Sequence, residues 1–393
     1  MRIAVLAHVR HPIRPPFMGG MEAHAYHLAR ELQRRGHDVT LFAAGDSDAG
    51  VPLRPVMRAH YEQRYPWHEY HGTDELNDYL DGAFAKTCAE LLAGDFDVVH
   101  NNTLHRYLPR LSRVYRVPMV TSLHVPAFEW LRRAVEESAA PWTRFTATTR
   151  QHARSYWAAA LPAEAHVVHN GIDPAAWAYG ERGDGSVVWA GRIAPNKGTH
   201  LAVAAARRAG LPMTLYGPVE REDYFAAEVA PLLTPAIQYG GHVSAARLSA
   251  ALRRASVFAF TPMWDEPFGL AAVEAMACGL PVAAFDRGAV REVIGERAGR
   301  YAAGGDVVGL AAAMRRCLAI DRAEPRRRVE GHYSITRMVD GYEAVYERAV
   351  AGLGSEAADV EFPEWELRVG APPARASLDH VAELPRALLH GVE

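Results

Sequence analysis

Short apolar runs alternate with segments of helical periodicity from the first residues of the chain onward. Residues 3–9 (IAVLAHV) form a run typical of a buried strand, and residues 21–35 carry apolar side chains on one helical face until Gly36. Further strand-like runs lie at 39–43, 98–100, 118–123 and 145–149, and a helical pattern covers 76–93. Alternation of this kind predicts parallel strands with covering helices.

The same alternation begins again near residue 187. Strand-like runs lie at 187–190, 213–217, 257–261 and 281–285, and helical patterns lie at 199–209, 245–254 and 269–278. The two halves meet at HNGIDPAAW (169–177), where the Asn-Gly and Asp-Pro pairs indicate turns. We therefore predict an α/β fold in which two doubly wound, Rossmann-like domains face a cleft.

Two stretches do not follow the alternation. Residues 44–75 form a long connection, and residues 354–393 are rich in Pro, Glu and Ala without a long periodic segment. We expect the latter to be a surface-wrapping or partly disordered extension. The expected division is a first domain at 1–172, a second at 173–335, a helix at 336–352 that packs back on the first domain, and a tail at 353–393.

Composition narrows the class of protein. The chain is 49% hydrophobic and 23% charged with a net charge of −3, which is typical of a globular enzyme and argues against non-specific nucleic-acid binding. The three cysteines have no CxxC spacing, so we expect neither a disulfide framework nor a zinc site. No run reaches about 18 apolar residues, the length that a membrane-spanning helix needs. The apolar run near the N-terminus is too short for the hydrophobic region of a signal segment. We therefore expect a cytoplasmic protein without a membrane span.

Two loops that follow predicted strands carry groups suited to anions. Gly19 and Gly20, in PPFMGGMEAH, place backbone amides at a helix start, although a plain turn explains them equally well. Arg192 and Lys197, in AGRIAPNKG, leave the carboxyl end of a strand, where ligands bind in open α/β sheets. Two cations on such a loop can neutralise a pyrophosphate, and a solvated loop is the alternative.

A third loop combines carboxylates with backbone amides. In TPMWDEPFGLAAVEAMACGLPV, Glu266 lies on the loop and Glu274 lies about two helical turns further on. A charge among apolar neighbours is costly without a partner. Carboxylates accept hydrogen bonds from hydroxyls, and the amides of Phe268, Gly269 and Leu270 can donate to phosphate oxygens. The alternative is a surface Glu together with a Glu paired to an Arg.

These motifs in this order resemble those of the GT-B fold glycosyltransferases of family 4. The motifs are GG, the His of SLHVP, HNGID, GRIAPNKG and EPFGLAAVEAMACGLPV, and the resemblance covers about residues 1–350. The Glu-x7-Glu element that encloses PFG is the most specific of them. The resemblance implies a retaining enzyme that transfers a hexose from a nucleotide-diphosphate sugar to a hydroxyl acceptor.

The resemblance also implies roles for single residues, all of which would contact the donor. Glu274 would bind the ribose, and Val243 would contact the base. Arg192 and Lys197 would bind the pyrophosphate, and Gly19 and Gly20 would donate to the phosphate from the opposite domain. Glu266 and the amides of Phe268, Gly269 and Leu270 would hold the sugar and phosphate, and His124 would lie near the reacting sugar. Uridine is the commonest base in the family, so UDP-glucose is the expected kind of donor. Thymidine and guanosine remain alternatives.

The implied reaction needs no metal and no cofactor, because cations and amides stabilise the departing phosphate. We expect front-face transfer in which His124 positions the sugar. Two Asp-x-Asp triplets, Asp46/Asp48 and Asp95/Asp97, leave a metal site as the alternative. Two other functions stay open: an epimerase of nucleotide sugars with the same fold, and a non-catalytic relative that only binds nucleotide.

The acceptor is less constrained. The segment HYEQRYPWHEYH (60–71) offers Tyr61, Tyr65, Trp67 and Tyr70 for stacking on a sugar, and His60, His68 and His71 as possible metal ligands. It can equally be a loop that packs on its own domain. We expect a small molecule, a glycan or a lipid-linked sugar, the last because His27, Arg30, Arg34 and Arg35 give the first helix positive charge.

Overall fold

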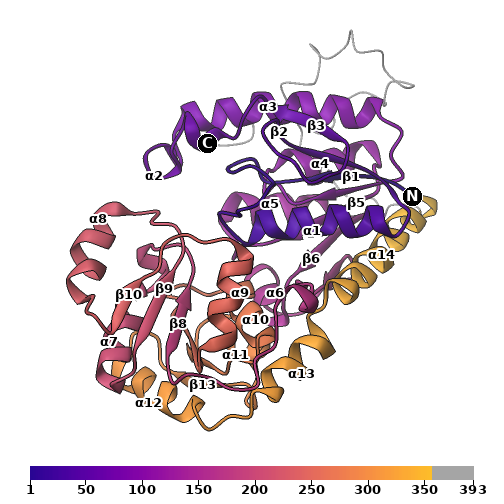
Figure 1. Cartoon of the computed structure of the whole chain (residues 1–393). Helices are drawn as coiled ribbons and strands as arrows, with labels where there is room; N and C mark the ends of the chain where they lie inside the picture. Colours follow the sequence, from indigo (N-terminus) through magenta and orange to yellow (C-terminus); the bar gives the residue numbers. More distant parts are fainter. Residues whose placement is uncertain (356–393) are drawn as a thin grey trace.

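Two parallel sheets, each covered by helices, build residues 1–355, the part of the chain that the computed structural model describes (Figure 1). The first sheet has the strand order β3-β2-β1-β4-β5-β6-β7, and the second has the order β10-β9-β8-β11-β12-β13. In both sheets the strand that opens the unit lies between strands wound in opposite directions, so the loops after β1 and β8 leave at a topological switch point. The predicted fold class, two doubly wound α/β domains, is confirmed.

The first domain uses short strands that are buried on both faces, as parallel strands are. Its strands are β1 (Arg2–Leu6), β2 (Asp38–Ala44), β3 (Leu53–Met57), β4 (Val98–Asn101), β5 (Met119–Leu123), β6 (Thr143–Ala147) and β7 (Ala165–Val167). Its helices are α1 (Gly20–Arg34), α2 (Trp67–Tyr70), α3 (Asp74–Ala93), α4 (Tyr107–Tyr115), α5 (Glu129–Ser138) and α6 (Arg150–Tyr156).

The second domain repeats this plan. Its strands are β8 (Val187–Ala190), β9 (Met213–Tyr216), β10 (Ile237–Tyr239), β11 (Val257–Phe260), β12 (Val282–Phe285) and β13 (Gly299–Ala302). Its helices are α7 (Thr199–Ala209), α8 (Glu222–Tyr224), α9 (Ala245–Arg254), α10 (Leu270–Ala277), α11 (Val290–Ile294), α12 (Val307–Cys317) and α13 (Ala323–His332). No helix in the described residues is long and apolar enough to cross a membrane.

The connection at residues 44–75 contains a strand that its sequence pattern did not reveal. Among the described residues β3 pairs only with β2, and its Arg54 and Pro55 are exposed. A strand with one neighbour keeps little apolar periodicity, and proline is tolerated at such an edge because its missing N–H faces solvent. The segment is therefore partly a sheet edge rather than an irregular loop.

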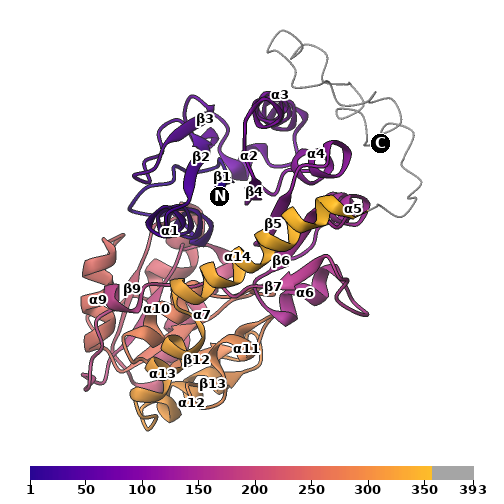
Figure 2. The ribbon, with the colours of Figure 1, turned by 90° about the vertical axis from the view of Figure 1, so that its right-hand side faces the viewer.

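The last helix, α14 (Ile335–Ala351), returns from the second domain to the first. Figure 2 shows it running from α13 along the first domain to α5. Its Val339, Tyr342 and Tyr346 are buried in one core with Val5 of β1 and Leu28 of α1. Residues 356–393, which make up most of the expected tail, lie outside the described residues.

The two chain segments that pass between the domains run side by side. The amide of Ile172 donates to the carbonyl of Tyr333 at 2.9 Å, and the amide of Ile335 donates to the carbonyl of Ile172 at 2.8 Å. A Cβ on Gly171 would lie 2.5 Å from the carbonyl oxygen of Ser334, so only glycine permits this approach. The crossings thus form one hydrogen-bonded connection at one edge of the interface.

A carboxylate of the second domain completes a helix of the first. The amides of Arg150 and Gln151, at the start of α6, both donate to the Glu292 carboxylate at 2.9 Å. The first amides of a helix have no partner within the helix, so Glu292 satisfies two of them. Nearby, the Thr148 and Thr149 hydroxyls donate to the carbonyl of Pro267 at 2.9 and 3.0 Å. These bonds fix the first domain against the loop that carries Glu266.

We expect Glu292→Ala to lower the free energy of unfolding by about 1–2 kcal/mol, the usual cost of losing a helix cap. The measurement is urea unfolding followed by circular dichroism. Glu296→Ala is the matched control, because Glu296 makes only an exposed ion pair with Arg291 and such pairs contribute little. Equal stability of the two variants would show that the bond between Glu292 and α6 does not join the domains.

Candidate active site

Loops from both domains meet where the carboxyl ends of their strands lie. Gly20 begins α1, and a Cβ placed on it would lie 3.1 Å from Cδ1 of Leu270, the first residue of α10 in the other domain. The two predicted amide sites, at the start of α1 and at the start of α10, are therefore brought together. Gly19 is the N-cap residue of α1, as the predicted helix start required.

The start of α10 depends on one glycine. Gly269 has φ of +92°, and a Cβ on it would lie 2.8 Å from Cζ of Phe260. The left-handed backbone turns the chain from the loop into the helix, and only glycine adopts it here without strain and without a clash. Phe268 is buried next to it, whereas Leu270 is half-buried. The three residues thus form a rigid helix start at the interface.

Lys197 and Glu266 pair within the second domain. The Lys197 Nζ lies 2.9 Å from Oε2 of Glu266, and the Trp264 indole N–H donates to the same oxygen at 2.8 Å. Lys197 also lies over the Trp264 ring, 5.0 Å from its centroid. Glu266 is therefore neither a surface residue nor the partner of an arginine. Lys197, which we expect to bind the pyrophosphate, and Glu266, which we expect to bind the sugar, are therefore in direct contact.

Arg192 has a different partner. Its Nη1 donates to Oε1 of Glu220 at 2.6 Å, and Arg10 of the first domain donates to the same oxygen at 2.9 Å. Arg10 is held in turn by Glu62. Arg192 thus lies at the interface as predicted, but a carboxylate of the protein already neutralises it.

Glu274 is the exception among these charged groups. Within residues 1–355 no hydrogen bond or ion pair reaches its half-buried carboxyl. Burial raises the pKa of Glu274 to about 8. A carboxyl that lacks a partner in an apolar surrounding is costly for the fold, and such groups often serve a ligand.

His124 belongs to a cluster of neutral histidines. Its Nε2 lies 2.8 Å from Oδ1 of Asn102, whose amide group donates to the carbonyl of Leu6. The carboxamide oxygen therefore accepts from Nε2–H, which leaves Nδ1 as the acceptor of the ring. Burial, together with the nearby His24 and His100, holds the pKa of His124 well below its usual range. A neutral imidazole suits positioning of a hydroxyl better than donation of a proton.

Three other histidines, His100, His169 and His24, have partners within the protein or are buried. His100 is fully buried and lies within hydrogen-bond distance of the Tyr346 hydroxyl and of Ser122. The His169 ring nitrogen Nδ1 lies 2.8 Å from the carbonyl of Thr148. His24 is buried with its ring centroid 4.6 Å from that of His124, and burial lowers its pKa to about 3.

Val243 lies in the loop before α9 and is half-buried. Ser244 follows it and caps α9 by accepting from the amide of Arg247. Within residues 1–355, Val243 belongs to neither of the two hydrophobic clusters of the second domain. Its assignment to the base therefore stays a prediction.

The aromatic segment at 60–71 divides into buried and exposed residues. Tyr61 and Tyr65 are in the core of the first domain, whereas Trp67 is 40% exposed. The Arg10 guanidinium lies over the Trp67 ring, 5.0 Å from its centroid, so Trp67 is next to the interface. Of the four aromatic residues expected to stack on a sugar, two are thus in the core, Tyr70 is half-buried, and Trp67 is exposed.

The candidate metal ligands have other partners. Asp46 pairs with His60, and Asp95 and Asp97 pair with Arg2. Over residues 1–355, no group of three or more His, Cys, Asp or Glu side chains is placed to hold a metal ion.

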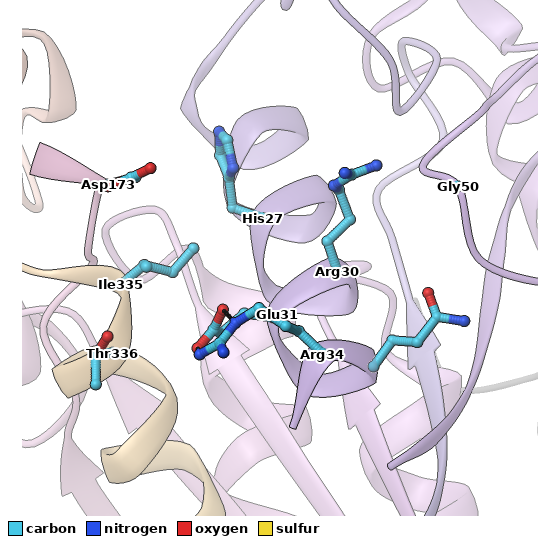
Figure 3. Close-up of a pocket in the computed structure, with 9 residues that line it drawn as sticks. His27, Arg30, Glu31, Arg34, Gly50, Asp173, Ile335 and Thr336 are labelled. Carbon is cyan, nitrogen blue, oxygen red and sulfur yellow. Dashed lines mark hydrogen bonds and ion pairs between the residues drawn. The ribbon is translucent and has the colours of Figure 1, made fainter. Parts of the chain in front are cut away.

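A pocket lies on the outer face of α1 (Figure 3). It contains the basic residues of this helix, but Arg34 is paired with Glu31, and Arg30 lies over the Tyr26 ring. None of the predicted site residues lines it. Its lining residues are His27, Arg30, Glu31, Gln33, Arg34, Gly50, Asp173, Ile335 and Thr336.

Sequence reasoning missed several residues that touch the predicted site. Arg10, Glu220 and Asn102 each hold or orient a predicted residue, yet none belongs to a motif named above. The available signal was their position, since each follows the carboxyl end of a strand: β1, β9 and β4. Glu22 is a further one. Burial raises its pKa, and the positive charges of Arg192 and Arg10 oppose that change.

Comparisons with known proteins agree with this architecture. Glycosyltransferase Family 4 matches residues 18–176, and Glycosyl transferases group 1 matches residues 179–331. The chain is 30% identical to a glycogen synthase of Mycobacterium tuberculosis, over 80% of this chain and 86% of that protein. It is 28% identical to a phosphatidyl-myo-inositol mannosyltransferase of Mycobacterium leprae, over 81% of this chain and 89% of that protein.

Solved structures show the same fold at lower identity. Anabaena Alr3699/HepE in complex with UDP and glucose matches with a TM-score of 0.68 and 19% identity, over 88% of this chain and 99% of that one. The sucrose-phosphate synthase of Thermosynechococcus elongatus matches with a TM-score of 0.71 and 19% identity, over 89% of this chain and 100% of that one.

We expect Glu274→Gln to stabilise the ligand-free protein. The folded pKa of about 8 lies above the ordinary value of 4.5, so the wild type loses stability as pH rises from about 4.5 through 8. The side-chain amide of the Glu274→Gln variant does not ionise, so the variant does not lose stability in this way. The variant should therefore be the more stable protein at pH 8, with about 4 kcal/mol as the upper limit that this pKa shift allows, and should gain little at pH 4.5. Melting temperatures across this range test it, with exposed Glu181→Gln as control. A gain independent of pH would contradict the assignment.

Proposed function

We propose a function from the premise that the chain belongs to the family 4, or group 1, glycosyltransferases, as its family matches and its 30% identical relative show. We infer that it moves a hexose from a nucleotide-diphosphate sugar to a hydroxyl acceptor with retention of configuration. The observation that carries the proposal is the meeting of Lys197, Glu266 and the α10 helix start with the α1 helix start of the other domain.

The donor that this arrangement suits has phosphates at its centre and hydroxyls at both ends. Lys197 and Arg192 supply charge for the diphosphate, and the helix starts at Gly20 and Leu270 supply amides. Glu266 and Glu274 would then accept from hydroxyls of the hexose and of the ribose. The unpartnered Glu274 supports this role, because hydroxyl donors would stabilise its charged form. Val243 would contact the base.

Structural neighbours support uridine as the base. Structures of Anabaena Alr3699/HepE hold UDP, UDP with glucose, and UDP-glucose. The relatives named mannosyltransferases support a hexose as the transferred group. We therefore propose a UDP-linked hexose, such as UDP-glucose, as the donor.

The chemistry requires a nucleoside diphosphate to leave the anomeric carbon. Negative charge grows on the phosphate as the bond breaks, and Lys197 and Arg192 are cations in the right region to stabilise it without a metal. His124 is a neutral imidazole and would position a sugar hydroxyl through Nδ1. We propose front-face transfer, in which the departing phosphate takes the proton of the acceptor hydroxyl.

The first test of this proposal is the melting temperature with UDP, TDP, GDP and ADP, each with and without EDTA. A ligand at 100 times its dissociation constant stabilises a protein by about 2.7 kcal/mol. We expect a shift with UDP that EDTA does not change. UDP-glucose should then be turned over, and NMR of the product should show retained configuration. A protein stabilised by none of the four nucleotides would contradict the proposal, and an altered donor sugar would indicate an epimerase.

The two glutamates should separate binding from transfer. Glu274→Ala should weaken UDP binding by about tenfold to a hundredfold, because it removes a charged acceptor of ribose hydroxyls. Glu266→Ala should leave UDP binding within about threefold and lower the transfer rate by about a hundredfold or more. Calorimetry with UDP and turnover of UDP-glucose measure the two effects. Wild-type binding and turnover in both variants would refute the site.

A further inference from the structure

One carboxylate oxygen receives two guanidinium groups from opposite sides of the interface. Oε1 of Glu220 accepts from Arg192 at 2.6 Å and from Arg10 at 2.9 Å. Arg192 follows β8 of the second domain, and Arg10 follows β1 of the first. An anionic oxygen held by two arginines is the arrangement in which proteins bind a phosphate oxygen.

The backbone holds Glu220 in this place. The amide of Glu220 donates to the carbonyl of Ile193 at 3.2 Å, and the amide of Ile193 donates to the carbonyl of Pro218 at 2.8 Å. The loop after β9 is thereby paired with the residue that follows Arg192. The side chain of Glu220 is 21% exposed, so it can turn outward without a change in this pairing.

Arg10 is also prepared for an anion. Its side chain is 13% exposed, and Glu62 accepts from its Nε at 2.7 Å and from its Nη2 at 3.2 Å. The same Nη2 donates to Glu220 at 2.9 Å. The charge of Arg10 also reaches the buried carboxyl of Glu22 at the start of α1, close to Gly19. Arg10 therefore brings the first domain's positive charge to the helix start that faces Leu270.

We propose that Glu220 occupies the place of a donor phosphate oxygen, and that the diphosphate displaces it so that Arg10 and Arg192 bind the donor together. This inference rests on the proposed function, because it takes the diphosphate of a nucleotide as the ligand. It assigns Arg10 as a donor-binding residue of the first domain. It assigns Glu220 as a competitor of the donor, which neutralises the two arginines and joins the domains before the donor binds.

Two consequences follow from the charges. Without the Glu220 carboxylate, both arginines are free for the ligand, so diphosphate binding tightens. Without the Arg10 guanidinium, the ligand loses a charge-assisted hydrogen bond from the opposite domain, so binding weakens. A purely structural ion pair predicts the reverse for Glu220, because its loss would only loosen the interface.

The experiment is calorimetric titration of the full chain with UDP and, separately, with inorganic pyrophosphate. We expect Glu220→Gln to bind both at least about tenfold more tightly than wild type, and Arg10→Gln to bind both at least about tenfold more weakly. Arg10→Lys should fall between Arg10→Gln and wild type. Glu222→Gln, an exposed carboxylate two residues away, is the matched control and should bind like wild type. Circular dichroism and melting temperatures establish that each variant is folded.

Each outcome decides the proposal. Equal or weaker binding by folded Glu220→Gln overturns it, as does wild-type affinity in both Arg10 variants. If Glu220→Gln does not fold, Glu220→Ala is titrated under the same criterion. Pyrophosphate binding that follows the expected order, with no binding of UDP, would support this site and reject the nucleotide-sugar donor. If UDP binds but Glu220→Gln binds it no more tightly than wild type, the nucleotide-sugar donor is supported and the role of Glu220 is rejected. Absence of binding of either ligand to every variant would count against both.

Discussion

Neutralisation of positive charge at the domain interface is the constraint on which the rest of this structure depends. Arg10 and Arg192 approach each other from two domains, with the Glu220 carboxylate between them and Glu62 as a second partner of Arg10. Lys197 is neutralised in the same way by Glu266. The cations of the candidate site are thus paired with carboxylates, and in our proposal an anionic ligand replaces one of these carboxylates.

The two edges of the interface are held by different kinds of contact. At one edge the two crossing segments are hydrogen-bonded to each other, Glu292 completes α6, and the aromatic face of α14 is buried in the first domain. These contacts are apolar or involve the backbone, so no ligand competes for them. At the other edge the contacts are ion pairs between side chains, which a phosphate can replace. This division suits a fold that holds its domains together and still admits a charged ligand.

The histidine cluster shows how the first domain supports this interface. His24, His100 and His124 lie close together beneath the loops, and burial keeps all three neutral. Tyr342 and Tyr346 of α14 contact the same rings. The return of the last helix therefore does more than close the core of the first domain. Its two tyrosines pack on His24 and His100, the two rings whose proximity helps to lower the pKa of His124.

The sequence alone determined the class of fold and the loops that carry the site. Alternation of apolar runs with helical periodicity is encoded in neighbouring residues, which is why α7 and α9 fell at their predicted bounds and the two α/β units were evident. Local motifs likewise marked Gly19, Arg192, Lys197 and Glu266 as candidates for the site, and these assignments stay predictions. Tertiary structure alone decided which groups are paired: Glu220 with both arginines, Glu266 with Lys197, and Glu274 with no partner among residues 1–355. Ion pairing and burial join residues far apart in the chain, and no local pattern records them until the two domains are in contact.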